Sequence, residues 1–126
     1  MLRFGTIGSG WIVDEYIHGA KDSGLWELTA VYSRSEERAQ AFAEKHEAKS
    51  YFTDLEKMAA SKEIDAVYIA SPNALHYSQS KLFLEHGKHV ICEKPVCAQA
   101  EQFRELQQMA TEDRVVWLEA IVYRHE

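Results

Sequence analysis

The first residues with chemical potential form a glycine-containing turn near the amino end of the chain. Gly8 and Gly10 stand between a short apolar run at residues 2–7 and a segment whose apolar side chains have helical spacing. In this setting Gly8 allows a tight turn, and Gly10 lets the backbone approach a pyrophosphate whose charge the amides of the helix start stabilise. The pattern predicts a dinucleotide site, although Val13 stands where a third glycine is common.

A second chemical signal lies at the end of the next apolar run, residues 26–32. NAD-binding proteins carry an acidic side chain at this point, and it holds a ribose hydroxyl. This sequence has Ser33 and Arg34 there, with Arg38 one helical turn later. A hydroxyl and two guanidinium groups favour a 2′-phosphate, and therefore NADP over NAD. The alternative is that both arginines form ordinary surface ion pairs with neighbouring glutamates.

Two more polar segments follow predicted strands. Ala-Ser-Pro-Asn at residues 70–73, with His76, follows one apolar run, and Glu-Lys-Pro at residues 93–95 follows the next. In a doubly wound parallel sheet, ligands bind at the carboxyl ends of the strands, which is where both segments are expected. Two of these residues also have a simpler interpretation: His76 can cap its helix, and Lys94 can be a solvated loop lysine.

These residues depend on a regular alternation of strands and helices. Strands are expected at residues 2–7, 26–32, 50–52, 66–70, 89–92 and 115–118. Helices are expected between them, with Ser35 and Thr53 as N-caps, Glu56 completing a capping box with Thr53, and Gly24 and Gly87 as stops. The alternation predicts an α/β fold: a three-layer doubly wound parallel sheet, or Rossmann fold, of about six strands in the order 3-2-1-4-5-6.

Length and charge restrict the classes of partner. The chain has 126 residues and a formal net charge of −6, which corresponds to one domain over residues 1–126. No stretch gathers Lys and Arg on one face, and no apolar run approaches the roughly 18 residues of a membrane helix, so neither nucleic acid nor a membrane is an expected partner. No signal peptide is recognisable, which favours a cytoplasmic location.

The two cysteines do not suggest a metal or redox centre. Cys92 and Cys97 are five positions apart, which matches neither a redox pair nor a zinc spacing. We expect both to be reduced and no metal to be bound.

Three ordered motifs together resemble a known family. The glycine turn, residues 64–73 with His76, and residues 87–95 are similar to the amino-terminal half of the glucose-fructose oxidoreductase and inositol dehydrogenase family, Gfo/Idh/MocA. The resemblance covers nearly the entire chain. It implies the following assignments: Gly8, Ser9, Gly10, Trp11 and Ile12 in the pyrophosphate loop; Ser33 and Arg34 at the adenosine ribose; Ala70, Ser71, Pro72, Asn73 and His76 beside the nicotinamide-side ribose; and Glu93, Lys94 and Pro95 in the signature whose lysine sits beside the nicotinamide.

The same resemblance implies an activity. Members transfer a hydride between nicotinamide and a sugar-like or polyol-like substrate, and Lys94 is the one residue here that we expect to take part by positioning the substrate. The family's second, α+β domain supplies the acid-base group, most sugar contacts and often the oligomer interface. We expect that domain to be lacking from residues 1–126, so this chain is expected to bind NADP, or NAD as second choice, with little or no turnover.

Other hypotheses remain open from sequence. One is a non-catalytic dinucleotide-binding sensor or partner module, and another is a structural remnant without a ligand. The substrate itself is not specified by these residues.

Overall fold

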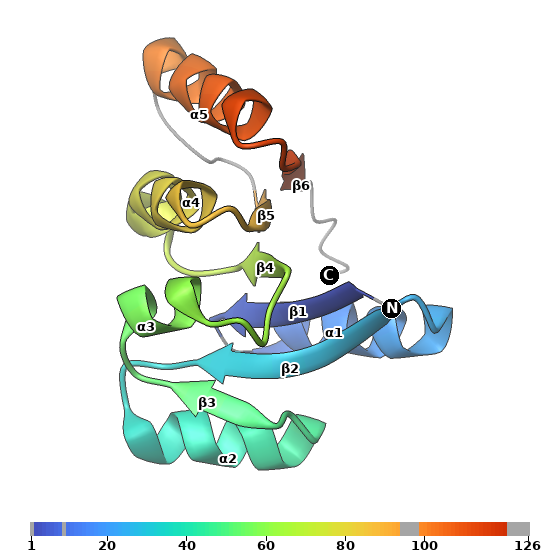
Figure 1. Cartoon of the computed structure of the whole chain (residues 1–126). Coiled ribbons are helices and arrows are strands. Elements are labelled where there is room, and N and C mark those ends of the chain that lie inside the picture. Colours follow the sequence, from blue (N-terminus) through green and yellow to red (C-terminus); the bar gives the residue numbers. More distant parts are fainter. Residues whose placement is uncertain (1, 9, 94–98, 121–126) are drawn as a thin grey trace, which may run out of the picture.

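The computed structural model describes residues 2–8, 10–93 and 99–120, which form one parallel sheet with helices on both faces (Figure 1). The sheet order β3-β2-β1-β4-β5-β6 confirms the predicted fold class and topology. The strands are β1 (Leu2–Ile7), β2 (Trp26–Tyr32), β3 (Ser50–Phe52), β4 (Ala66–Ile69), β5 (His89–Glu93) and β6 (Trp117–Ala120). The helices are α1 (Trp11–Ser23), α2 (Glu36–His46), α3 (Leu55–Ala60), the 3₁₀ helix η1 (Asn73–Leu75), α4 (His76–Glu85) and α5 (Ala100–Glu112).

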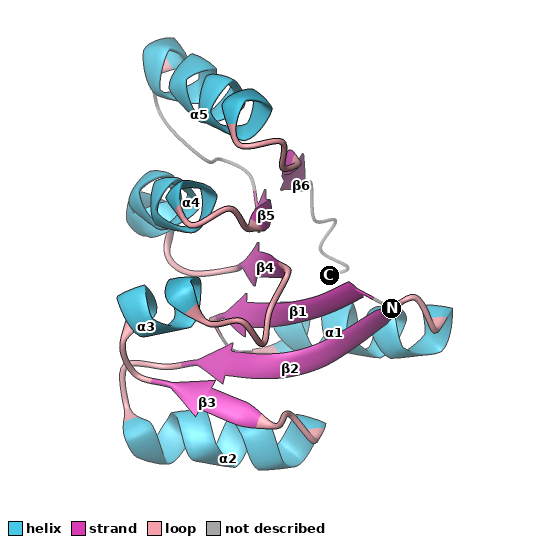
Figure 2. Cartoon of the chain, viewed as in Figure 1, coloured by secondary structure: helices cyan, strands magenta, loops and turns pink. Residues whose placement is uncertain are grey.

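Two apolar clusters hold the layers together, one on each face of the sheet (Figure 2). Helices α1 and α2 cover one face, where Val13 and Ile17 pack with Phe4 of β1. Helices α3, α4 and α5 cover the other face, where Phe83 and Leu106 are fully buried. None of the helices in the described part of the chain is long and apolar enough to cross a membrane.

A β-bulge in β2 changes which side chains face each layer. The register between β1 and β2 shifts, because Phe4 pairs with Leu28 whereas the next residue, Gly5, pairs with Ala30. Thr29 is the extra residue, and its hydroxyl donates to the carbonyl oxygen of Glu63 at 2.8 Å. The bulge interrupts the simple alternation of faces, so the side chains at the end of β2 are set by this irregularity.

The boundaries of several elements differ from the expected ones. The last strand begins at Trp117 instead of Val115, because α5 continues to Glu112 and Arg114 then adopts a left-handed conformation with φ 57°. The segment after β4 forms a 3₁₀ turn before the helix proper. Ser35 and Gly24 cap α2 and α1 as predicted.

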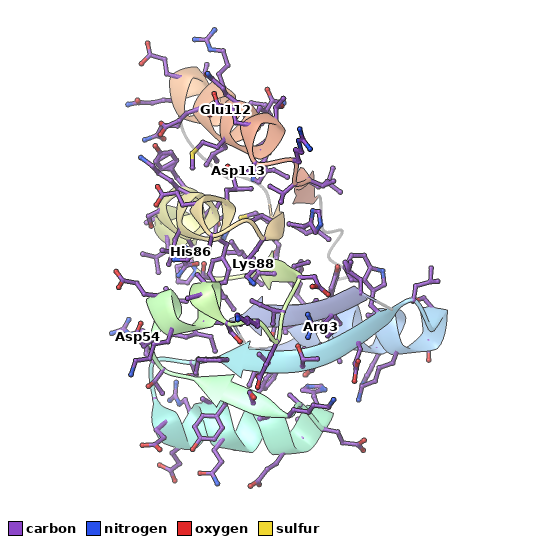
Figure 3. The ribbon with its side chains drawn as sticks, viewed as in Figure 1. Arg3, Asp54, His86, Lys88, Glu112 and Asp113 are labelled. Carbon is purple, nitrogen blue, oxygen red and sulfur yellow. The ribbon has the colours of Figure 1, made fainter. Side chains whose placement is uncertain are left out.

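The predicted N-cap of α3 is wrong by one position. Asp54, not Thr53, is the N-cap residue, and its carboxylate accepts hydrogen bonds from the backbone amides of Glu56 and Lys57 at 2.9 and 3.2 Å (Figure 3). Asp is as good a cap as Thr or better, and its charge also suits the positive end of the helix dipole. The aspartate therefore takes the position that the capping-box pattern had assigned to threonine.

This correction gives a direct prediction. Replacing Asp54 with Ala is expected to lower the free energy of unfolding by about 1 kcal/mol, because two helix amides lose their acceptor. Thr53→Ala is the matched control and should change stability by less than about 0.5 kcal/mol. Urea titrations followed by circular dichroism measure both values. An equal or larger loss of stability for Thr53→Ala would show that Thr53 is the N-cap, as the capping-box pattern predicts.

Candidate dinucleotide-binding site

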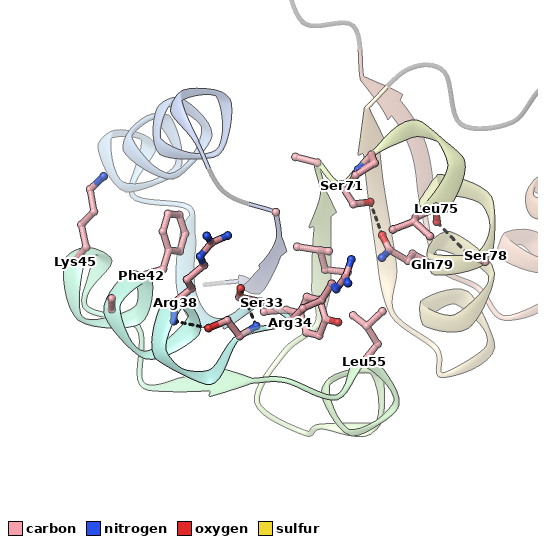
Figure 4. A pocket seen from close by; sticks show the side chains of 17 residues that line it. Ser33, Arg34, Arg38, Phe42, Lys45, Leu55, Ser71, Leu75, Ser78 and Gln79 are labelled. Atoms are coloured by element: carbon pink, nitrogen blue, oxygen red, sulfur yellow. Dashed lines mark hydrogen bonds between the residues drawn. The ribbon is translucent and has the colours of Figure 1, made fainter.

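An open cleft of about 1110 Å³ lies at the carboxyl ends of β1, β2 and β4 (Figure 4). It brings together residues that are far apart in the sequence. Seven residues of the predicted site line it: Gly8, Ser33, Arg34, Arg38, Ala70, Ser71 and Pro72. Among predicted residues that the structure describes, Gly10, Ile12, Asn73, His76 and Glu93 are not part of that lining. Ser9, Lys94 and Pro95 lie outside the described residues, and so does the side chain of Trp11.

The two glycines of the turn have different structural roles. Gly8 has φ 108°, and a Cβ atom there would lie 2.7 Å from the carbonyl oxygen of Ala70, which is shorter than any normal contact. Gly10 has φ 107° and occupies the N-cap of α1, but a Cβ atom there would meet nothing within 4 Å. Gly8 therefore lets β1 approach the end of β4. Gly10 leaves open space in front of the α1 amides, where an anion can be bound.

The β2 side of the cleft is cationic. Its basic lining residues are Arg34, Arg38 and Lys45, and none of the described lining residues carries a carboxylate. Both arginines are exposed. No ion pair within 4.0 Å joins either arginine to a carboxylate in the part of the chain that the structure describes, so the alternative of surface ion pairs is not what this structure contains. A phosphorylated ligand fits this set of donors.

Lys45, which lines the cleft, takes part in a charged group that joins α1 to α2. The carboxylate of Asp14 accepts from His46 Nε2 at 2.6 Å and from Lys45 Nζ at 3.2 Å. Burial of the Asp14 carboxyl opposes its ionisation, but the hydrogen bonds from His46 and Lys45 outweigh burial and hold its pKa below the usual value. Asp14 therefore stays ionised, and its two hydrogen-bond donors offset its negative charge near the start of α1.

The loop after β4 is fixed by α4 on two sides. Ser71 donates its hydroxyl proton to the carboxamide oxygen of Gln79, and the buried ring of His76 donates from Nε2 to the Ser71 carbonyl oxygen at 2.6 Å. His76 thus positions the loop backbone from the core side, without lining the cleft itself. Its predicted role as a direct cofactor ligand remains a prediction.

Glu93 is held by a buried tyrosine. Tyr68 of β4 is 2% exposed, and its hydroxyl donates to Glu93 Oε1 at 3.0 Å. Burial and the neighbouring carboxylate raise the pKa of Tyr68 far above its usual value, so the hydroxyl keeps its proton and remains a donor. Tyr16 of α1 stacks on the Tyr68 ring with centroids 4.0 Å apart. These contacts fix the last residue before the Lys-Pro signature.

Several lining residues were missed by sequence reasoning. Phe42 and Lys45 continue the cleft along α2, four and seven positions after Arg38. Helical spacing was the available signal for both, since residues at these intervals share a face. Gln79 was missed because its helical spacing fits a core residue and gives no indication that the amide reaches the cleft.

The described part of the chain contains no metal-binding cluster. No cluster of three or more His, Cys, Asp or Glu side chains is placed to hold an ion there. Cys92 is buried, whereas Cys97 lies outside the described residues.

Comparison with known proteins gives concordant matches. Residues 2–120 match the Gfo/Idh/MocA family, described as an oxidoreductase family with an NAD-binding Rossmann fold. The chain is 52% identical over 121 residues to scyllo-inositol 2-dehydrogenase (NADP(+)) IolU of Bacillus subtilis, covering 96% of this chain and 37% of that protein. It is 50% identical over 120 residues to the uncharacterized oxidoreductase YgjR of Escherichia coli, covering 95% of this chain and 37% of that protein.

Solved structures agree with the fold. An NAD-binding oxidoreductase from Klebsiella pneumoniae superposes with a TM-score of 0.88 at 28% identity, over 94% of this chain and 34% of that one. Biliverdin reductase from Synechocystis, solved with biliverdin and NADP+, gives 0.84 at 25% identity, over 94% of this chain and 37% of that one.

The extent of these matches defines what they establish. The chain spans 37% of the length of the two curated relatives, and the match to the family covers nearly all of its own residues. The cleft lies where Rossmann domains bind their cofactor, at the carboxyl edge beside the glycine turn. This chain belongs to the Gfo/Idh/MocA oxidoreductase family and contains its NAD(P)-binding Rossmann domain.

Proposed function

We propose that this chain is the NADP-preferring cofactor domain of a dehydrogenase that acts on a hydroxyl or carbonyl group of a sugar or polyol. The observation that carries the proposal is the donor set at the end of β2: Ser33, Arg34 and Arg38 beside a cleft whose described lining lacks carboxylates. An unphosphorylated ribose needs acceptors at this position, whereas a 2′-phosphate needs donors and positive charge. The NADP(+) in the name of the Bacillus subtilis relative supports the same choice.

The residues of the cleft suit a dinucleotide in one orientation. The pyrophosphate belongs over Gly10, the N-cap of α1, because the space where its Cβ atom would lie is open and helix amides at this end bind anions. The 2′-phosphate belongs between the Ser33 hydroxyl and the two guanidinium groups, with Arg34 also available to stack on the base. When bound, the nicotinamide supplies the hydride chemistry.

The β5 side of the site would serve the substrate. Tyr68 fixes the Glu93 carboxylate, so the chain enters the Lys94-Pro95 segment from a defined point. We assign Lys94 to positioning the substrate hydroxyl or carbonyl by its charge. The acid-base group, most substrate contacts and the oligomer interface are assigned to a second α+β domain of the complete protein, and the isolated chain is expected to have little or no turnover. We place the protein in the cytoplasm, where NADP-linked sugar chemistry would find its cofactor.

Calorimetric titration of the chain with NADPH and NADH tests the cofactor proposal. NADPH is expected to bind more tightly by about tenfold or more, since charge-assisted hydrogen bonds to a phosphate contribute about 1.5–3 kcal/mol. Tighter binding of NADH would reject the NADP preference. If neither nucleotide bound with a dissociation constant below roughly 1 mM, corresponding to about −4 kcal/mol, the site assignment itself would be wrong.

A further inference from the structure

Gln79 is a polar side chain on a helix face that otherwise packs against the core. It lies on α4 and is 6% exposed, beside buried residues such as Phe83, yet it also lines the cleft. Burying an amide is costly unless its polar atoms find partners. The position therefore calls for an explanation beyond packing, because an apolar residue would fill the helix face at no such cost.

The Gln79 amide is held by a hydrogen bond from its neighbour. Ser71 has one hydroxyl proton and gives it to the Gln79 carboxamide oxygen. Ser71 is itself held by the bond from His76 to its carbonyl oxygen. With its oxygen directed to Ser71, the amide presents its NH₂ group toward the interior of the cleft (Figure 4). The bond holds the amide against the loop after β4, at the wall of the cleft.

The ligand group that reaches Gln79 follows from the position of the phosphate. In a 2′-phosphorylated adenosine, the base is attached to the ribose carbon adjacent to the one that carries the phosphate. A phosphate held by Ser33 and Arg34 therefore places the base in the neighbouring part of the cleft. Figure 4 shows Arg34 and Leu55 on one side of that space and Leu75 and Gln79 on the other. A guanidinium plane and two leucines suit the faces of a purine.

We propose that Gln79 reads the edge of the adenine base, which makes it a specificity-determining residue for the nucleotide. This inference rests on the proposed cofactor site. The amide NH₂ donates to a ring nitrogen next to the 6-amino group. The carboxamide oxygen, which has two lone pairs, accepts from that amino group as well as from Ser71. The recognition is selective because a 6-oxo base has no amino group to donate to the carboxamide oxygen.

Hypoxanthine analogues of the cofactor provide the test. Reduced NADP and reduced nicotinamide hypoxanthine dinucleotide phosphate differ only in the base, where an oxygen replaces the 6-amino group. The wild-type chain should bind the adenine form about 5- to 150-fold more tightly, the range expected for one bidentate contact with a base. Affinities within twofold of each other would overturn the role of Gln79. Both nucleotides carry the same 2′-phosphate, so this ratio is independent of whether NADPH binds better than NADH.

Variants separate base recognition from a packing role. Gln79→Met keeps the volume and removes both polar atoms, and should abolish the preference by weakening the adenine form. Ser71→Ala should also reduce the preference, but by a smaller factor, because it removes a partner that holds the amide in place and leaves the amide itself; Ser71→Thr should retain it. A purely structural role for Gln79 predicts equal losses for both nucleotides and would refute the proposal.

Ser78 provides the matched control. It lines the same cleft from the same helix, but its hydroxyl donates to the backbone carbonyl oxygen of Leu75 at 3.2 Å. Ser78→Ala should therefore leave the ratio of the two affinities unchanged. A change as large as that of Gln79→Met would show that the ratio responds to any substitution in α4 and would also refute the proposal. Circular dichroism melting of each variant establishes that it is folded when titrated.

Discussion

Replacement of Arg34 by aspartate is expected to convert a preference for NADPH into a preference for NADH. The substitution removes a guanidinium donor and places a carboxylate beside the 2′-phosphate site. Loss of the charged hydrogen bonds costs about 1.5–3 kcal/mol, and repulsion adds to that, so NADPH affinity should fall by about 100-fold or more. NADH should bind at least as well as before, because the new carboxylate can accept from the ribose hydroxyl. Titration calorimetry with both nucleotides measures the reversal.

The chain offers controls for the change of charge. Arg104 is exposed on α5 and does not line the cleft, so Arg104→Asp makes the same change in net charge away from the site. It should leave the NADPH-to-NADH ratio unaltered. Arg38→Ala should reduce NADPH affinity by a smaller factor without favouring NADH. If Arg34→Asp and Arg104→Asp had equal effects, the preference would be a property of net charge and not of the Arg34 site.

Alanine substitutions in the glycine turn should separate folding from nucleotide binding. Gly8→Ala is expected to lower the free energy of unfolding by about 2–4 kcal/mol. The left-handed conformation alone costs about 1–3 kcal/mol, and the new methyl group meets the Ala70 carbonyl oxygen at 2.7 Å. Gly10→Ala bears the conformational cost alone, since its methyl group enters open space. It should nevertheless weaken NADPH binding by about tenfold or more, because that space is where the pyrophosphate approaches the backbone.

Two measurements on each variant distinguish these effects. Chemical denaturation gives the free energy of unfolding, and calorimetry below the unfolding transition gives the affinity. The expected pattern is a larger stability loss for Gly8→Ala and a loss of affinity for Gly10→Ala that exceeds what its stability predicts. Full NADPH affinity in Gly10→Ala would place the pyrophosphate elsewhere.

The sequence was sufficient for the topology because each element carries a local signal. The limits of β1, β2 and β3 agree with those expected. For β1 and β2 the signal is an apolar run that stops at a glycine or serine, whereas β3 is a three-residue, partly exposed edge strand. The end of α5 was less predictable. The chain there continues through Asp113 and Arg114 in a tertiary-dependent turn, and no residue type marks the left-handed position at Arg114. The bulge at Thr29 was also beyond local reasoning, because it depends on the register with a neighbouring strand.

The site was predictable where one residue type performs a recognisable function. Gly8, Ser33 and Arg34 fall into this group, and all three line the cleft. Gln79 does not, because the same helical spacing serves a core residue and a cleft residue equally well. The incorrect prediction of Thr53 as the N-cap of α3 has a similar origin. Thr53 and Asp54 are neighbours with acceptor side chains, and backbone geometry decides which of them caps the helix.

The hydrogen bond of Ser71 to Gln79 gives the two sides of the cleft different binding thermodynamics. Gln79 is already held in the folded chain, so its side chain loses little rotational freedom when a ligand contacts it. Arg34 and Arg38 are exposed, and ordering each long side chain on a phosphate costs about 0.5–1.5 kcal/mol of conformational entropy. Recognition of the phosphate should thus be enthalpy-driven against an entropic penalty, whereas the side of the cleft formed by the loop after β4 and by α4 is preorganised.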